Sequence, residues 1–370
     1  MSLLFFLKEE KGLTHFFSVL FLVDLLGSTL VWGMFRTGVP FLVPVWTLGI
    51  FWLMAALFIF ANTWLHVLPH PLTRILAWGS GLWMGFLYYG FLSLPVFLLA
   101  LLGGWYTGAT YWAGNAARIL FCLTIVLVLI GLIRALCPRV RKITLQMGKK
   151  IAHPYTLAFA SDIHFGGLFG KWHARRLVRW LNNQHPDAVL LGGDIVDGDL
   201  LFVQQEKTLE ILRDIVAQDG IYAVYGNHDK RMGTGPLEKY LLEQQGIRFL
   251  VDETCQITPV ITLTGMDDYL FGERKAEFAP EVGKYNIFME HEPQRIRQVA
   301  EKGYDLYFAG HTHAGQMFPN RIFTKRLFAL DYGQKRFGPL TAIVSSGWGL
   351  WGVPLRIGPR SEVVIVTLLP

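Results

Sequence analysis

Charged residues are distributed very unevenly along this 370-residue sequence, and the resulting boundary constrains the fold more than any other feature. Up to Pro138 there are only six basic and three acidic residues, out of 62 Lys, Arg, Asp and Glu in the chain. A segment of this length that avoids charge suits hydrocarbon, whereas the remainder has the composition of a domain in water. We therefore expect two domains, one in a membrane and one outside it.

Four apolar stretches in the first part reach the ~20 residues that a helix needs to cross the ~30 Å hydrocarbon core of a bilayer. The predicted spans are roughly Thr14–Phe35, Phe41–Asn62, Ile75–Leu102 and Arg118–Leu136. The first is too long for a cleavable signal peptide and lacks a small-residue cleavage site. These stretches predict an α-helical transmembrane domain of about four helices over residues 1–138.

Basic residues lie at both ends of this predicted domain. Lys8 and Lys11 precede the first span, and five basic residues follow the last one within residues 139–150. Basic segments beside spans stay in the cytoplasm, and an even number of spans places both termini on one side. We therefore predict a multi-pass protein of the cell inner membrane, with a basic juxtamembrane linker over residues 139–152 and a cytoplasmic domain over residues 153–370.

Net charge and cysteine content exclude other classes of function. The net charge of +6 suits an anionic membrane surface as well as it suits nucleic acid. Because membrane spans are predicted, we expect no nucleic-acid binding. Cys122, Cys137 and Cys255 have no CxxC spacing, so the sequence supports neither a disulfide framework nor a zinc knuckle.

The second part of the chain alternates short β-branched or apolar runs with helical stretches, which predicts an α/β domain. Five of the apolar runs are followed by polar motifs, and such sheets place their sites at strand ends. The motifs are Asp162-Ile163-His164, Gly193-Asp194, Gly226-Asn227-His228-Asp229, Glu290-His291 and Gly310-His311-Thr312-His313. Oxygen ligands with neutral imidazoles suit Mn, Fe or Zn, and the absence of thiolates argues against a structural zinc site.

The order of these motifs, DxH, GD, GNH[DE], H and GHxH, resembles the calcineurin-like metallophosphoesterase superfamily from Ala158 to about Leu368. The segments SDIHFG, GGDIVDG, YGNHD, HEP and GHTHAGQ are most similar to its membrane-associated branch, which includes YkuE-like and YaeI-like proteins and UDP-2,3-diacylglucosamine hydrolases. The sequence departs from that branch at Ala314, where glycine is commoner, and at residues 359–362, where PPE is usual. The resemblance implies a four-layer α-β-β-α sandwich and a metal-dependent phosphoric ester or pyrophosphate hydrolase.

The resemblance also implies that seven side chains hold two divalent metal ions, with Mn, Fe or Zn suitable and manganese favoured. The implied ligands are Asp162, His164 and His313 for one ion, Asn227, His291 and His311 for the other, and Asp194 for both. His228 would face the substrate and stabilise charge or protonate the leaving oxygen. Two such ions would lower the pKa of a shared water, and the hydroxide would attack phosphorus in line.

Attachment to a membrane would concentrate lipid substrates, so we expect a phosphodiester or pyrophosphate bond in a membrane lipid or lipid precursor, for example UDP-2,3-diacylglucosamine. A lipid-docking lip is predicted where aromatics adjoin a basic helix, and closure of the domain core by the same apolar groups is the open alternative. The lip comprises Phe165, Leu168, Phe169, Trp172, Arg175, Arg176, Arg179 and Trp180.

Several alternatives remain open at the level of sequence. One is an anchored phosphatase that acts on phosphoproteins or soluble nucleotides, and another is a non-catalytic sensor or scaffold. The sequence identifies no protein partner. Other polar residues have ordinary interpretations: Asp197, Asp267 and Asp268 are predicted in solvated turns, and His153, His173 and His185 at the surface or a junction.

Overall fold

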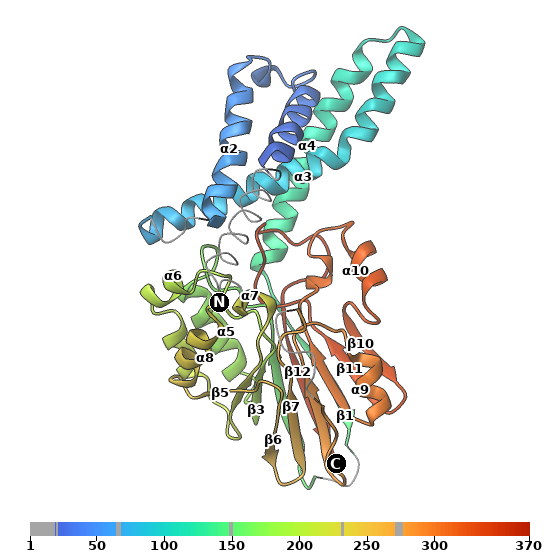
Figure 1. Ribbon diagram of the computed structural model, residues 1–370. Coiled ribbons are helices and arrows are strands. Elements are labelled where there is room, and N and C mark those ends of the chain that lie inside the picture. The colour runs from blue at the N-terminus through green and yellow to red at the C-terminus, as the bar shows by residue number, and fades with distance from the viewer. Residues whose placement is uncertain (1–18, 20, 64–67, 148–150, 231–232, 271–276) are drawn as a thin grey trace, which may run out of the picture. The chain divides into compact units, whose positions relative to one another are not determined.

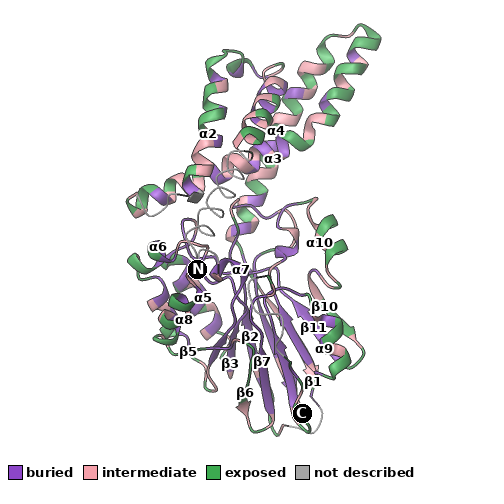
Figure 2. Cartoon of the chain, in the orientation of Figure 1, coloured by how far each residue is buried: buried purple, intermediate pink, exposed green. Residues whose placement is uncertain are grey.

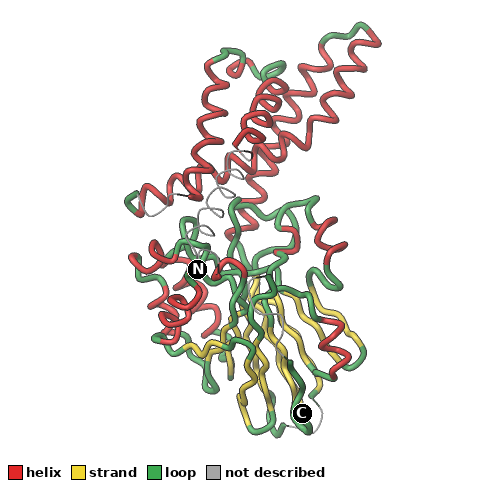
Figure 3. The backbone as a smooth tube through the Cα atoms, in the orientation of Figure 1, coloured by secondary structure: helices red, strands yellow, loops and turns green. Residues whose placement is uncertain are grey.

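The computed structural model of this protein describes residues 19, 21–63, 68–147, 151–230, 233–270 and 277–370. The chain divides into two compact units, the N-terminal unit of residues 1–132 with 352–354 and the C-terminal unit of residues 133–351 with 355–370. Helices make up the N-terminal unit, whereas the C-terminal unit combines helices with strands (Figures 1 and 3). This division agrees with the change in composition near Pro138.

The N-terminal unit contains two helices that are long and apolar enough, by length and composition, to cross a membrane. These are α3 (His70–Thr107) and α4 (Tyr111–Leu136). They cover the third and fourth predicted spans, and α3 continues through Pro95. Over the residues that the structure describes, the helix Phe21–Phe35 and α2 (Trp46–Thr63) are also apolar but do not reach the length of α3 or α4. Part of the first predicted span lies outside the described residues, so four membrane spans remain a prediction.

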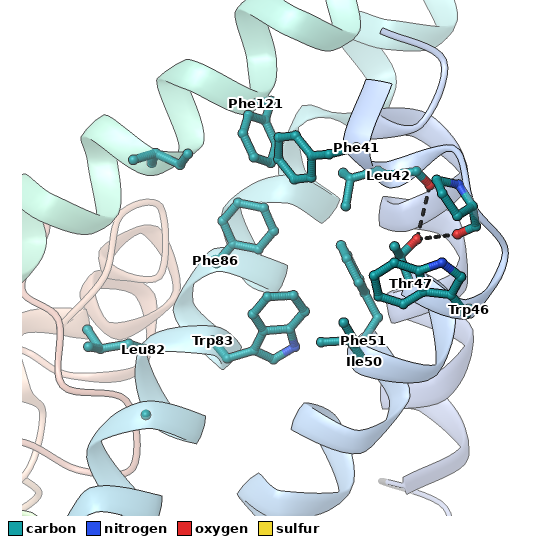
Figure 4. A pocket seen from close by; sticks show the side chains of 13 residues that line it. Phe41, Leu42, Trp46, Thr47, Ile50, Phe51, Leu82, Trp83, Phe86 and Phe121 are labelled. Atoms are coloured by element: carbon teal, nitrogen blue, oxygen red, sulfur yellow. Dashed lines mark hydrogen bonds between the residues drawn. The ribbon is translucent and has the colours of Figure 1, made fainter. Parts of the chain in front are cut away.

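Aromatic side chains form much of the interior of the N-terminal unit. The Phe35 ring contacts the rings of Phe86 and Phe121, with centroids 5.6 and 5.2 Å apart. Beside this cluster lies a cavity of about 800 Å³ (Figure 4). Phe51 and Trp83 are among its lining residues, which are almost all apolar, and short helix η1 (Pro40–Leu42) contributes to its rim. The cavity therefore suits a hydrocarbon group rather than a polar one.

Two six-stranded mixed sheets form the frame of the C-terminal unit. One sheet has the order β1 (Arg139–Gln146), β12 (Glu362–Leu369), β2 (Tyr155–Ala160), β3 (Ala188–Leu191), β4 (Ile221–Ala223) and β5 (Ile247–Phe249). The other has the order β10 (Gly333–Phe337), β11 (Leu340–Val344), β9 (Leu306–Ala309), β8 (Tyr285–Met289), β7 (Ile261–Gly265) and β6 (Glu253–Thr258). Strands β2 to β5 run parallel, as do β7, β8, β9 and β11.

The two sheets pack face to face around an apolar core. Their strands are largely buried (Figure 2). The rings of Phe159 from β2 and Phe308 from β9 stack across this core with centroids 4.8 Å apart. Helices lie on the outer sides, with α5 (Lys171–Asn182) and α8 (Gly235–Glu243) on one side and α9 (Ile296–Lys302) on the other (Figure 1). The parallel strands are covered on both faces, which explains their nearly continuous apolar sequences. The predicted α/β fold is confirmed.

The segment expected as a basic linker differs from the prediction in its first part. Residues 139–146 form strand β1, which pairs in parallel with β12 along its whole length. From Arg141 onward half-buried and exposed residues alternate, and Ile143 and Leu145 pack against the core, which fits an edge strand whose two faces meet different surroundings. Basic residues in this segment therefore belong to the sheet, and the other predicted domain borders remain predictions.

Candidate metal centre

The predicted site residues follow the carboxyl ends of strands in both sheets. Asp162 and His164 come after β2, Asp194 after β3, and Asn227 and His228 in α7 (Asn227–Lys230) after β4. His291 follows β8 in the second sheet, and His311 and His313 follow β9, where η5 (His313–Gly315) begins. Because parallel strands end at the same edge of a sheet, these loops converge. The packing of one sheet on the other then brings the two sets together.

The backbone of the site is strained. Five of the predicted ligands take left-handed conformations, which residues other than glycine rarely adopt. They are Asp162, His164, Asp194, His311 and His313, with φ between 47° and 66°. The ligands themselves thus adopt a conformation that turns more often assign to glycine. Such strain clusters at functional sites, where the surrounding structure holds it in place.

Three groups of side chains place their ligand atoms within 4.8 Å of one another. The groups are Asp162 with His164 and His313, His164 with Asp194 and His228, and Asp162 with Asp194 and His291. All six of these residues are buried. Asp194 belongs to two groups, one of which contains His164 and the other His291. Its position between them is the one that a shared ligand requires.

The contact between His291 and Asp194 fits a bound cation. His291 Nδ1 lies 2.8 Å from the carbonyl oxygen of Gly192, which can only accept, so Nδ1 carries the proton. The other ring nitrogen, Nε2, lies 3.2 Å from Asp194 Oδ2. Burial would lower the pKa of His291, but Asp194 raises it well above its usual range, so in the absence of metal Nε2 holds a proton that faces Oδ2. A divalent ion at this position would replace that proton and be bound by the same two atoms. The donor set therefore fits a divalent ion.

His311 lies outside the three groups but contacts the same region. Its Nδ1 is 3.0 Å from Asn227 Oδ1, and its ring centroid is 5.2 Å from that of His291. Its Nε2 is 3.8 Å from Oε1 of Glu292, a buried carboxylate that the sequence analysis did not single out. Asn227, His291 and His311, the ligands implied for the second ion, are thus neighbours in space.

A second residue missed by sequence reasoning is Asp197, which was predicted in a solvated turn. Its Oδ1 lies 2.9 Å from His228 Nδ1 and 3.4 Å from His164 Nδ1. A carboxylate at Nδ1 fixes the orientation of an imidazole and leaves Nε2 to act elsewhere. The second aspartate of GGDIVDG was the available signal for this contact, because it lies only three positions after Asp194.

Asp194 also anchors the neighbouring loop. Its Oδ1 accepts a hydrogen bond from the backbone amide of His228 at 2.8 Å. Asp229, the last residue of the same motif, accepts from the amides of Ile195 at 2.8 Å and Gly226 at 2.8 Å. These bonds tie the loop after β3 to the loop after β4. Asp229 therefore braces the site.

Burial and mutual charge shift the pKa values in opposite directions. Burial alone would raise the pKa of Asp194, but His291 and His228 beside it hold that pKa well below its usual range. Burial raises the pKa of Asp162. Burial also lowers the pKa of His311 to about 3 and that of His313 well below its usual range, so both imidazoles are neutral at pH 7. Neutral imidazoles and an ionised carboxylate are the forms that bind metals.

Arg356 holds two loops of the site together from the inside of the domain. Its side chain is completely buried and donates to the backbone carbonyls of His313 at 3.1 Å, Ser346 at 2.6 Å and Gly349 at 2.9 Å. The backbone amide of Gly349 in turn donates to the carbonyl of Asp162 at 2.7 Å. One guanidinium thus links the loop that carries His313 to the loop that braces Asp162.

Other expectations from the sequence need correction. Phe165 and Phe169 of the predicted lipid-docking lip are buried, and Trp172 from that lip is exposed. His173 is buried instead of lying at the surface. Asp267 is largely buried and its Oδ1 lies 2.7 Å from Lys230 Nζ. Asp268 is buried too. The buried residues among these are covered by tertiary packing that the local sequence does not reveal.

Comparisons with known proteins point to one family. The family profile of the calcineurin-like phosphoesterases matches residues 155–315. An uncharacterized metallophosphoesterase of Helicobacter pylori is 32% identical over 63% of this chain and 64% of its own length. A second one, from Aquifex aeolicus, is 32% identical over 56% of this chain and 83% of its own length.

A third relative, from Danio rerio, has the name transmembrane protein with metallophosphoesterase domain, and it is 28% identical over 66% of this chain and 61% of its own length. This chain spans about 64% of the Helicobacter pylori relative, so the matched region is only part of that protein. The name of the Danio rerio relative and the apolar helices α3 and α4 of this chain agree in indicating membrane association. The match to the Aquifex relative and the family profile confirm the predicted family, and this chain belongs to the calcineurin-like metallophosphoesterases.

Proposed function

We propose that this chain is a membrane-anchored phosphoesterase with two divalent metal ions, which hydrolyses a phosphodiester or pyrophosphate bond in a membrane lipid or lipid precursor. The observation that carries the proposal is the position of Asp194. It lies within 4.8 Å of ligand atoms from two groups, one with His164 and one with Asp162 and His291. A carboxylate shared in this way is the ligand that a pair of ions requires.

The side chains have distinct roles in this proposal. Asp162, His164 and His313 would hold one ion, and Asn227, His291 and His311 the other. When bound, two divalent ions lower the pKa of a shared water and neutralise phosphoryl oxygens. His228, held at Nδ1 by Asp197, would present Nε2 to the phosphoryl group and donate a hydrogen bond to it or a proton to the leaving oxygen.

The substrate class rests on the membrane part of the chain. An enzyme tethered to a bilayer meets lipid substrates at high local concentration and gains nothing for soluble ones. The cavity of about 800 Å³ in the N-terminal unit is lined almost entirely by apolar groups and could accept a lipid chain. We propose four membrane spans and a catalytic unit on the cytoplasmic side of the inner membrane, because basic residues flank the first and last spans.

The test of the chemistry starts from the full-length protein in detergent or nanodiscs. Metal content is measured, and hydrolysis of bis(p-nitrophenyl) phosphate is followed with Mn, Fe and Zn. Asp194→Asn should abolish turnover and reduce metal content. Asp187→Asn is the matched control, because Asp187 accepts a hydrogen bond from the amide of Thr156 at the start of β2, at the opposite end of that strand from the site. Equal activity in the two variants would refute the proposed centre.

The test of the substrate uses a panel of lipids in vesicles. It contains UDP-2,3-diacylglucosamine, polyprenyl pyrophosphates and common phospholipids, together with soluble nucleotides and phosphopeptides. Preference for a lipid supports the proposal. Turnover of nucleotides or phosphopeptides at higher kcat/KM than any lipid would establish instead an anchored phosphatase for soluble substrates, and protease protection in sealed vesicles would decide the side of the membrane.

A further inference from the structure

Helix α10 (Arg321–Leu327) is attached to the C-terminal unit by its polar side chains. Arg321 Nε lies 2.9 Å from Oδ2 of Asp331, and the Thr324 hydroxyl donates to the same oxygen at 3.1 Å. Asp331 itself is buried. The guanidinium of Arg321 also lies over the ring of Tyr332, 5.2 Å from its centroid. The side of the helix that faces the protein is therefore its polar side.

The apolar side chains of the same helix point away from the protein. Relative exposure is 46% for Ile322, 61% for Phe323 and 74% for Leu327, and no residue of the helix is buried. Green and pink colouring along α10 shows the same exposure (Figure 2). Surface helices of globular proteins normally bury the apolar stripe and expose the polar one. Helix α10 has the reverse arrangement, so its outer face requires an apolar environment.

Basic side chains accompany this apolar face. Lys325 and Arg326 are both exposed, and no ion pair joins either of them to another part of the chain that the structure describes. Phe318, just before the helix, is also exposed. Apolar groups next to unpaired basic groups suit the interface of a bilayer that contains anionic lipids, where hydrocarbon and negative charge lie within a few ångströms of each other.

The helix is also close to the metal centre. The ring of Phe328, the residue after α10, lies 5.9 Å from the ring of His311. Exposed Trp351 lies 5.9 Å from the ring of His228. Four of the exposed large apolar residues in the C-terminal unit fall within residues 318–327. Exposed apolar side chains thus lie beside the site.

We propose that α10 docks the C-terminal unit onto an anionic bilayer surface, with Ile322, Phe323 and Leu327 among the acyl chains and Lys325 and Arg326 at the headgroups. This inference rests on the proposed lipid substrate for its purpose, since docking would bring the metal centre to headgroup level. It moves the docking surface away from the predicted lip, where Phe165 and Phe169 are buried. The bilayer is favoured over a protein partner because α3 and α4 are long and apolar enough to cross a membrane and a relative carries the name of a transmembrane protein.

The experiment uses the full-length protein in liposomes that contain phosphatidylglycerol. Exposed Cys122 and Cys137 are changed to serine, and Leu327→Cys is labelled with bimane; Cys255 is buried. The matched control is Val282→Cys, a fully exposed position outside α10. Doxyl lipids should quench bimane at position 327 and leave it bright at position 282. The same doxyl quenching in phosphatidylcholine liposomes shows how much the anionic headgroups contribute.

A second variant, Lys325→Gln with Arg326→Gln, removes the charge and keeps the apolar face. Each basic residue near an anionic surface strengthens membrane binding, so the loss of both charges should lower the ratio of docked to undocked protein by about 30-fold. Quenching at position 327 that matches position 282 overturns the proposal. So does a label at 327 that iodide cannot reach and doxyl lipid does not quench, because protein then covers the helix.

Failure of docking and failure of the proposed function give different results. Each labelled protein is assayed in parallel with bis(p-nitrophenyl) phosphate, which needs no membrane. Metal-dependent turnover without lipid quenching at position 327 refutes the docking surface and leaves the phosphoesterase intact. Lipid quenching without any turnover supports the docking surface and refutes the phosphoesterase.

Discussion

His173 lies buried in a stack of aromatic rings, and we predict that it makes the C-terminal unit sensitive to acid. Its ring stacks on that of Phe169 with centroids 3.9 Å apart and lies 5.2 Å from the ring of Trp348. Neither ring nitrogen has a hydrogen-bond partner among the described residues. Burial, with a smaller contribution from Arg176, lowers the pKa of His173 from 6.5 to about 3.

The sign and size of the effect follow from the two pKa values. The unfolded state binds a proton near pH 6.5 and the folded state only near pH 3, so the free energy of unfolding decreases as the pH falls through this window. At pH 5 the loss is about 2 kcal/mol, because the unfolded imidazole gains about 1.36 kcal/mol for each unit below its pKa. For a unit of this size that corresponds to about 4 to 8 °C in Tm.

The change to test is His173→Phe, which keeps an aromatic ring in the stack and removes the titrating group. Tm is measured from tryptophan fluorescence at pH 7.5 and pH 5, after treatment with chelator so that loss of metal at low pH does not contribute. The variant should lose about 4 to 8 °C less than the wild type between the two pH values. His153→Gln is the control, because His153 is exposed and should leave the difference unchanged.

The reasoning about burial would be refuted if His173→Phe lost as much Tm on acidification as the wild type. It would also be refuted if His153→Gln gave the same protection as His173→Phe. His173→Leu serves as a second variant in case the phenylalanine ring does not fit the stack. The comparison is made within each protein, between two pH values, so a uniform change in stability does not alter the conclusion.

Four further predictions concern the metal centre. Asp197→Asn should lower kcat about 10- to 100-fold at saturating metal, because His228 loses the carboxylate at Nδ1. Steady-state kinetics with a soluble diester would show this loss, and an unchanged kcat would contradict it. Gly226→Ala places a Cβ 2.2 Å from Asp194 Oδ1, so the purified protein should contain less metal than the wild type. Arg356→Met leaves three buried carbonyls without their donor and should cost about 3 kcal/mol or more, measured as a lower Tm. Chelation should abolish turnover and lower Tm, by an amount equivalent to about 2.7 kcal/mol if metal was present at 100 times its Kd; a Tm that does not respond to metal would contradict a bound pair of ions.

Much of the site could be predicted from the sequence because its ligands are written in short, ordered motifs. A single residue separates Asp162 from His164, and a single residue separates His311 from His313. The apolar strand patterns before these pairs fix their place at strand ends. Asp197 and Glu292 were not predicted as contacts. A carboxylate in a turn looks solvated until the histidine that it faces, 31 residues away in the case of His228, has been placed.

Exposure of side chains was the least predictable property. Phe165 and Phe169 looked like a docking lip because they adjoin arginines, but the fold buries them. The segment of α10 has a mixture of apolar and basic residues that gives no indication of which side faces out. That depends on Asp331, which binds Arg321 and Thr324 and turns the apolar side chains away.

The sequence by itself determined the division between an apolar part and a water-exposed part, the α/β class of the second and the residue types of a metal centre. These are local properties, because hydropathy and strand-end chemistry are read from neighbouring residues. The tertiary structure decided which side chains meet. The two sheets pack face to face, and only this packing places His291 within reach of Asp194 and seals Arg356 beneath the loops that it holds.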